Sequence, residues 1–172
     1  MTEGTLIEIL EVTQSSAENS EFLRGCNIDM PNQGDKMDSQ KILFKGWVLG
    51  KKYRALAVEL ISSGETIEKI AVDQSRPDVF EVSPDISYAK NSGFLVEVEV
   101  SKLLQAGALV LEVVFSDGRR VQIGEVQYRK KLPFLRQVQE DLERSKVWLQ
   151  NIEAELSSAG SSKSGIKNTV NE

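Results

Sequence analysis

Between Phe44 and Val126 apolar and polar residues alternate in short runs, and the runs are separated by turn-forming residues. A period of two is the pattern of a β-strand that buries one face. Many short strands with turns between them are typical of antiparallel sheets, whereas a parallel sheet needs a long crossover after each strand. The region therefore predicts a mainly β fold, an antiparallel immunoglobulin-like β-sandwich.

Six runs show the alternation clearly, and two earlier ones show it weakly. The clear runs lie at 42–47, 55–61, 68–72, 94–100, 109–115 and 121–128, and the weak runs at 5–12 and 22–30. Turns are expected at 50–52, in a four-residue loop at 62–65, and at 116–119. Residues 1–40 are expected to add strands and loops, with loops at 13–20 and 31–40, and residues 41–128 form the core of the sandwich.

The segment from Asp73 to Ser92 does not alternate, and Pro77 and Pro84 exclude a central strand there. We expect a long ordered connection between the two sheets, with a short helical turn over 77–80. Its apolar residues Val79, Phe80 and Val82 are expected to face inward.

After Tyr128 the apolar period changes from two to steps of three and four, which predicts an amphipathic, coiled-coil-like helix over 129–157. The seam of this helix consists of Leu135, Val138, Leu142, Leu149, Ile152 and Leu156, with Ser145 as its polar interruption. An isolated helix of this length is marginal in water, so the seam needs a partner. That partner is a second copy of the chain, a helix of another protein, or the surface of the sandwich itself. Residues 158–172 are expected to form a flexible tail.

Composition excludes several classes of function. The sequence has no histidine, which removes the commonest acid–base group and metal ligand. A net charge of -5 disfavours nucleic acid as a partner. No apolar run approaches the roughly 20 residues that span a bilayer, and residues 1–4 do not begin a secretory signal. A single cysteine, Cys26, fits a reducing compartment, so we expect a cytoplasmic protein. Because histidine and metal-binding motifs are absent from the sequence, we also expect no cofactor and no bound metal.

Four short blocks occur in order along the chain: Gly46-Trp47-Val48, Ala57-Val58-Glu59-Leu60, Arg76-Pro77-Asp78-Val79 and Asn91-Ser92-Gly93-Phe94. Over about Lys41 to Val126 this pattern resembles a β-sandwich accessory module of cyanobacterial proteins. Such modules stand N-terminal to or beside sulfotransferase, glycosyltransferase or methyltransferase domains. The resemblance implies a recognition or scaffolding part, because the chain itself has no Gly-rich phosphate loop.

Three residues are candidates for ligand binding. Arg76 has a guanidinium suited to a sugar or an anion, and Asp78 lies two positions further on. The structural alternative is that Arg76 bonds within its own loop while Asp78 caps a short helix. Trp47, with Tyr53, Tyr88 and Tyr128, offers aromatic faces for sugar stacking, but a core role is more usual for such residues.

These observations favour a non-catalytic interaction or scaffolding module, in which the helix mediates self-association or docking to a partner protein. The alternative is a carbohydrate-binding accessory module of a sulfo- or glycosyltransferase system. Neither hypothesis requires a catalytic residue, a nucleic acid or a membrane.

Overall fold

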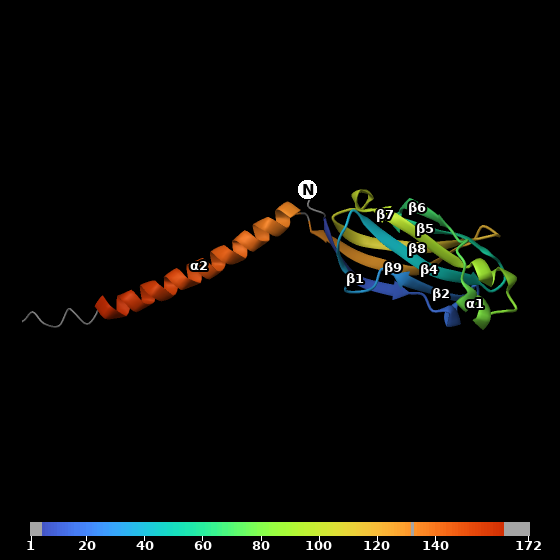
Figure 1. Ribbon diagram of the computed structural model, residues 1–172, viewed down its shortest axis with the longest axis horizontal. Coiled ribbons are helices and arrows are strands. Elements are labelled where there is room, and N and C mark those ends of the chain that lie inside the picture. The colour runs from blue at the N-terminus through green and yellow to red at the C-terminus, as the bar shows by residue number, and fades with distance from the viewer. Residues whose placement is uncertain (1–4, 132, 164–172) are drawn as a thin grey trace, which may run out of the picture. The chain divides into compact units, whose positions relative to one another are not determined.

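The computed structural model describes residues 5–131 and 133–163, with side chains described for 5–131 and 137–160. The chain divides between Lys131 and Leu132 into two compact units. We call residues 5–131 the β-domain. The second unit holds a single described helix, α2 (Figure 1).

In its described part the β-domain contains nine strands, one α-helix and short 3₁₀ turns. The strands are β1 (Leu6–Gln14), β2 (Leu23–Met30), β3 (Lys36–Asp38), β4 (Lys41–Gly50), β5 (Ala55–Ser62), β6 (Glu65–Ala71), β7 (Gly93–Glu99), β8 (Ala106–Phe115) and β9 (Arg120–Lys131). The helices are α1 (Pro77–Val82) and α2 (Pro133–Lys163), and the 3₁₀ turns are Ala17–Asn19, Ser87–Asn91 and Val100–Lys102.

The strands form two antiparallel sheets, which curl like half a barrel. The larger sheet has the order β3-β1-β9-β8-β5-β6, and the smaller has the order β2-β4-β7. A mainly β, antiparallel fold with one C-terminal helix is thereby confirmed. The segment 73–92 joins β6 of the larger sheet to β7 of the smaller one, as expected from its length.

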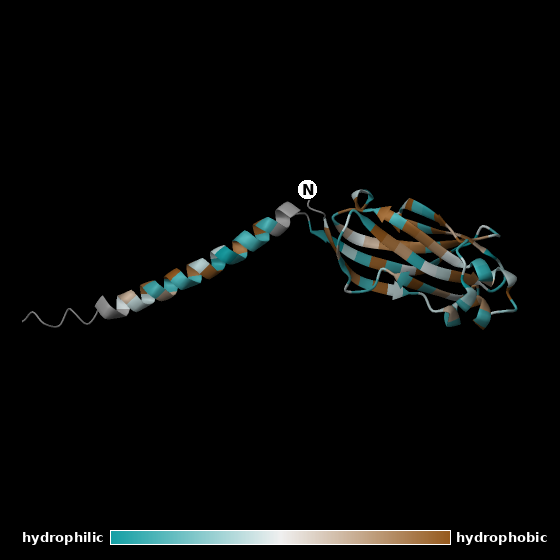
Figure 2. Cartoon of the chain, viewed as in Figure 1, coloured by the Kyte–Doolittle hydropathy of each residue, from teal (hydrophilic) through white to brown (hydrophobic). Residues whose placement is uncertain are grey.

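The inner faces of both sheets contribute to one hydrophobic core. Alternation places Ile7, Leu60 and Leu111 of the larger sheet in it, with Phe44 and Phe94 of the smaller sheet, and all five are almost fully buried. Figure 2 shows the resulting change between hydrophobic and hydrophilic colour along the strands. Burying one such side chain contributes about 1.5–3 kcal/mol, so this shared core is what holds the two sheets together.

Three local predictions in the β-domain are wrong. The loop expected over 31–40 contains the short strand β3, whose formation depends on its pairing with β1. The four-residue loop at 62–65 is a two-residue turn, because Ser62 pairs with Glu65. In the run over 55–61, Leu56 alternates in step with Val58 and Leu60, which predicts that it shares their buried face. It is 49% exposed instead, since an irregularity between Ala55 and Ala57 interrupts the alternation.

The predicted helix over 129–157 is displaced at both ends. Residues 129–131 belong to β9, where Lys131 pairs with Leu6 of β1, and the helix begins at Pro133. Proline suits this first position, because it has no N–H for the helix to satisfy. The helix runs on through Gly160 to Lys163, because extending a formed helix is easier than starting one. The rest of the expected tail, 164–172, lies outside the described residues.

Candidate functional site

The segment 73–92 packs against the outer face of the smaller sheet, opposite the shared core. Val79 of α1 and Ala89 of the 3₁₀ turn bury against Leu49 of β4, and these three form a second hydrophobic cluster. Partly buried neighbours around them are Trp47, Phe80, Ile86 and Tyr88. The short helix turns only one side to the sheet, so Val82, expected to face inward, is 81% exposed. The expected helical turn itself is confirmed as α1.

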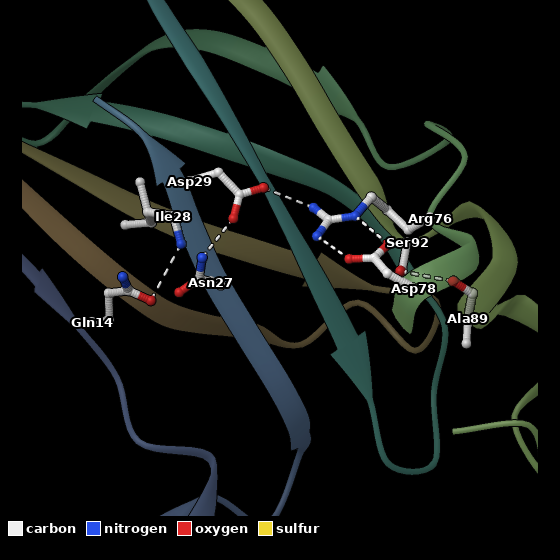
Figure 3. Close-up of polar contacts among 8 residues, drawn as sticks. All are labelled: Gln14, Asn27, Ile28, Asp29, Arg76, Asp78, Ala89 and Ser92. Atoms are coloured by element: carbon white, nitrogen blue, oxygen red, sulfur yellow. Dashed lines mark hydrogen bonds and ion pairs between the residues drawn. The ribbon is translucent and has the colours of Figure 1, made fainter. Parts of the chain in front are cut away.

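Arg76, immediately before α1, binds two aspartates from different elements (Figure 3). Its Nη1 lies 2.8 Å from Oδ2 of Asp29 on β2. Its Nε and Nη2 donate to the two carboxylate oxygens of Asp78, at 2.9 and 2.7 Å. Asn27 donates its side-chain amide to the other oxygen of Asp29 at 2.5 Å. We call Arg76, Asp29 and Asp78 the arginine clamp, since it ties the connection to an edge strand.

Within the arginine clamp, Arg76 and Asp78 hold each other in their charged forms. The hydrogen bonds from Arg76 lower the pKa of Asp78 to about 2, and the same bonds raise the pKa of Arg76. A bidentate guanidinium–carboxylate contact fixes geometry as well as charge. Three of the five N–H groups of Arg76 therefore already have protein partners, and an external anion would compete with Asp78, whose side chain is 61% exposed.

Gly93 lets the connection approach β7 closely. Its N–H donates to the Gln74 carbonyl at 3.0 Å, and its carbonyl accepts from the Gln74 N–H at 2.9 Å. A Cβ on Gly93 would lie 2.9 Å from Cβ of Gln74 and 3.0 Å from Cγ of Arg76. A larger residue would push the segment away from β7, so Gly93 helps to place the arginine clamp.

Trp47 lies on the outer face of β4, with its indole ring over Gly25 of β2. A Cβ on Gly25 would meet Cη2 of Trp47 at 2.6 Å. The ring walls a mostly apolar hollow of about 330 Å³, whose other lining residues are Arg24, Leu49, Asp78, Val79, Val82 and Ser83. Trp47 is partly buried in the second hydrophobic cluster, so a core role and a role as pocket wall coincide in one side chain.

A second hollow, of about 460 Å³, lies on the other side of Asp78. Arg76, Asp29 and Asp78 line it together with Lys45 of β4 and Leu95 of β7. Its lining is mixed in polarity, with two acidic and two basic side chains. An arrangement of this kind suits a ligand that carries hydroxyl or mixed-charge groups better than a simple anion.

The three ligand-binding candidates from the sequence thus lie on one outer face of the β-domain. Asp78 lines both hollows, while Trp47 lines the first and Arg76 the second. No sequence pattern indicated Asp29, Lys45 or Leu95 as site residues, because each stands in an ordinary strand. Only the packing of the 73–92 segment brings them next to Arg76.

The tyrosines do not extend Trp47 into a platform. Tyr88 packs in the second cluster and donates its hydroxyl to the Gly50 carbonyl at 3.2 Å. Tyr53 packs against the main core. Tyr128 is buried, and within the described residues its hydroxyl has no hydrogen-bond partner. Burial raises the pKa of both Tyr88 and Tyr128.

A buried carboxylate that the sequence did not indicate lies on the outer face of the larger sheet. Glu59 of β5 is only 4% exposed and receives hydrogen bonds from Arg120 and Thr66, with Lys69 at 3.8 Å. The hydrogen bond from Arg120 lowers the pKa of Glu59. The charge is thus fully compensated by its neighbours, which is the arrangement of a structural ion network.

The seam of α2 is exposed along its described length. The exposed fractions are 46% for Val138, 53% for Leu142, 53% for Leu149 and 66% for Leu156. Ile152 is partly exposed, and the side chain of Leu135 lies outside the described residues. Ser145 donates its hydroxyl to the Asp141 carbonyl at 2.9 Å, so the polar position in the seam is satisfied within the helix.

Within the described residues no cluster of His, Cys, Asp or Glu has the arrangement of a metal site. No helix in the described ranges has the length and apolarity to cross a membrane. The thiol of Cys26 is partly buried, and burial raises its pKa. In comparisons with known proteins, no family model, curated protein or solved structure matched the chain.

Proposed function

We propose that this chain is a non-catalytic interaction module in which α2 associates with α2 of further copies and displays several β-domains together. The observation that carries the proposal is the exposed seam of α2. Apolar residues recur there at steps of three and four over more than three turns of helix, and Leu142, Leu149 and Leu156 are each more than half exposed.

Physical chemistry supports a helical partner for this seam. Fully burying one leucine contributes about 1.5–3 kcal/mol, so several seam residues together offset the loss of freedom on association. Ser145 does not oppose burial strongly, because its hydroxyl already donates to the Asp141 carbonyl. The helix also carries charged residues outside the seam, including Glu143 and, directly beside the seam, Lys146; these two are joined at 3.0 Å.

The test is the mass of the full chain in solution, by sedimentation. The wild type is expected to associate, and Leu142→Glu to sediment as a single chain of 19.1 kDa, because it places a charge in the seam. The matched control is Val147→Glu. Val147 is 57% exposed on the same helix but lies outside the seam, so this variant should keep the wild-type mass.

A Leu142→Glu variant that keeps the wild-type mass would contradict the proposal, as would a monomeric wild type. Circular dichroism of both variants shows whether the β-domain stays folded. That measurement separates loss of association from loss of structure.

A second proposal is glycan binding on the outer face of the smaller sheet, as in an accessory module of a glycan-modifying enzyme. The supporting observation is that Trp47, Arg76 and Asp78 line adjoining hollows. Trp47→Phe should weaken binding to a glycan array while preserving the fold, and Tyr53→Phe, away from this face, serves as the control. An array without any bound glycan would overturn the proposal.

Within the antiparallel class, we propose an immunoglobulin-like relationship. Two sheets around one core support it. The two sheets have six and three strands, whereas those of a constant-type immunoglobulin domain have four and three. The proposed relationship therefore lies in the packing of two sheets around one core and not in the strand order. An experimental structure of this chain, compared strand by strand with an immunoglobulin domain, tests it.

A further inference from the structure

The positions beside the seam of α2 carry information about how copies are oriented. With the leucines 135, 142, 149 and 156 at heptad position a, the residues at d are Val138, Ser145, Ile152 and Ala159. The flanking g positions are Asp141, Trp148 and Glu155, and the flanking e positions are Gln139, Lys146 and Glu153. Charges at e and g set partner choice and orientation in helical assemblies.

In a parallel assembly, a g residue faces the e residue five positions further on in the neighbouring copy. Asp141 then faces Lys146, which is an attractive contact. Trp148 faces Glu153, and Glu155 faces Gly160. No like charges meet at these positions, and each seam layer consists of identical residues, so the Ser145 side chains lie together.

In a fully overlapping antiparallel pair, g faces g and e faces e. The layer that joins Leu142 to Ile152 then places Asp141 opposite Glu155, and Lys146 opposite its own counterpart. Both contacts bring like charges together. The charge pattern therefore favours the parallel arrangement of two or more copies.

The apolar residues favour more than two copies. Leucine at a with isoleucine at d shifts helical assemblies from dimers towards trimers and tetramers. The seam has leucine at every a position and β-branched residues at two d positions, Val138 and Ile152. Trp148 at g is 62% exposed and widens the apolar face beyond a and d, which fits a wider bundle.

Resting on the self-association proposed above, we infer that α2 forms a parallel, in-register bundle of three or four chains. Each β-domain precedes its helix in the sequence, so a parallel bundle attaches all of them at the same end. The outer faces with Trp47 and Arg76 are then presented in three or four copies. Linked copies bind a repetitive partner more tightly than one copy does.

Cross-linking of the full chain tests the orientation. In a Cys26→Ser background, Val138→Cys and Leu156→Cys variants are prepared separately and mixed. A parallel bundle gives disulfide-linked pairs within each variant alone. An antiparallel pair brings position 138 against 156 and gives linked chains only in the mixture, which would overturn the inference and leave self-association intact. The Val147→Cys variant, outside the seam, is the control and should remain largely unlinked.

Two further measurements complete the test. Sedimentation should give three or four times the 19.1-kDa mass of one chain, and a dimer would overturn the copy number. Asp141→Lys should weaken association several-fold, because it faces Lys146 in the parallel bundle. Stronger association of this variant would instead support the antiparallel pair, in which it faces Glu155. Monomers under all conditions would overturn both this inference and the proposed function.

Discussion

Nη1 of Arg76 lies 2.8 Å from Oδ2 of Asp29, and this ion pair joins the 73–92 segment to the edge strand β2 across 47 positions of sequence. Both side chains are mostly buried, with exposed fractions of 16% and 27%. The contact therefore belongs to the packing of the smaller sheet, and it also forms one wall of the larger hollow.

Removing this ion pair should destabilise the β-domain. Arg76→Ala leaves Asp29 without its charged partner, and a lost hydrogen bond to a charged group costs about 1.5–3 kcal/mol. The coupling free energy between Arg76→Ala and Asp29→Asn, from denaturant unfolding of the two single variants and the double variant, should exceed about 0.5 kcal/mol.

The control for that cycle is the exposed ion pair between Lys41 and Glu97, at 3.2 Å. Exposed pairs contribute little, typically between about 0 and 1 kcal/mol. Equal coupling free energies in the two cycles would contradict a structural role for the ion pair between Arg76 and Asp29. Such a result would favour a role of Arg76 in ligand binding.

Acid should weaken the arginine clamp over a defined pH range. The pKa of Asp78 is lowered from 3.8 to about 2 by its bonds with Arg76, so folding favours the carboxylate form. The contribution of the Asp78 carboxylate to the free energy of unfolding is complete at a pH above the pKa that Asp78 has in the unfolded chain. It is lost as the pH falls through the pKa that Asp78 has in the folded protein. The stability difference between wild type and Asp78→Asn should therefore shrink between about pH 4 and pH 2. A difference that stays constant over this range would contradict the assignment.

Periodicity was sufficient to predict most strands, because a half-buried strand must alternate. In the run over 68–72, alternation predicts that Ile70 and Val72 face inward, and both are buried. It failed at Leu56, where an irregular register turns the side chain outward, and at Glu59, whose burial depends on Arg120 from another strand. The exposure of Leu56 and the burial of Glu59 both depend on residues distant in sequence, so a local sequence pattern cannot predict them.

The candidate site shows the same division. The sequence pattern indicates Arg76 and Asp78, because they flank a proline in a segment without alternation. Their partner Asp29 lies in an ordinary strand, and only the tertiary structure brings it next to Arg76. The predicted N-terminal bound of the helix, residue 129, was too early for a similar reason, since pairing with β1 keeps residues 129–131 in β9.

The turn between β5 and β6 offers a stabilising substitution. Ser63 and Gly64 both have positive φ, at 50° and 82°. Turns of this kind favour Asn-Gly, because asparagine tolerates the left-handed region better than serine does. Ser63→Asn should therefore raise the free energy of unfolding. Gly64→Ala should lower it by about 1–2 kcal/mol, because an L-residue is strained in the left-handed region. A Cβ there meets nothing within 4 Å, so that loss would be conformational alone.

The contact of Gly25 with Trp47 gives the most direct test of the outer face. A methyl group at position 25 would lie 2.6 Å from Cη2 of Trp47, so Gly25→Ala must displace the indole from the second hydrophobic cluster. Overpacking of this kind costs about 1–3 kcal/mol. In a Trp148→Phe background, where Trp47 is the remaining tryptophan, its fluorescence emission should shift to longer wavelength as the ring becomes more exposed.

Gly107→Ala, whose Cβ would have its nearest contact at 3.8 Å, is the matched control. Unchanged emission and stability in Gly25→Ala would mean that the ring does not rest on β2, and the hollow beside it would lose its wall.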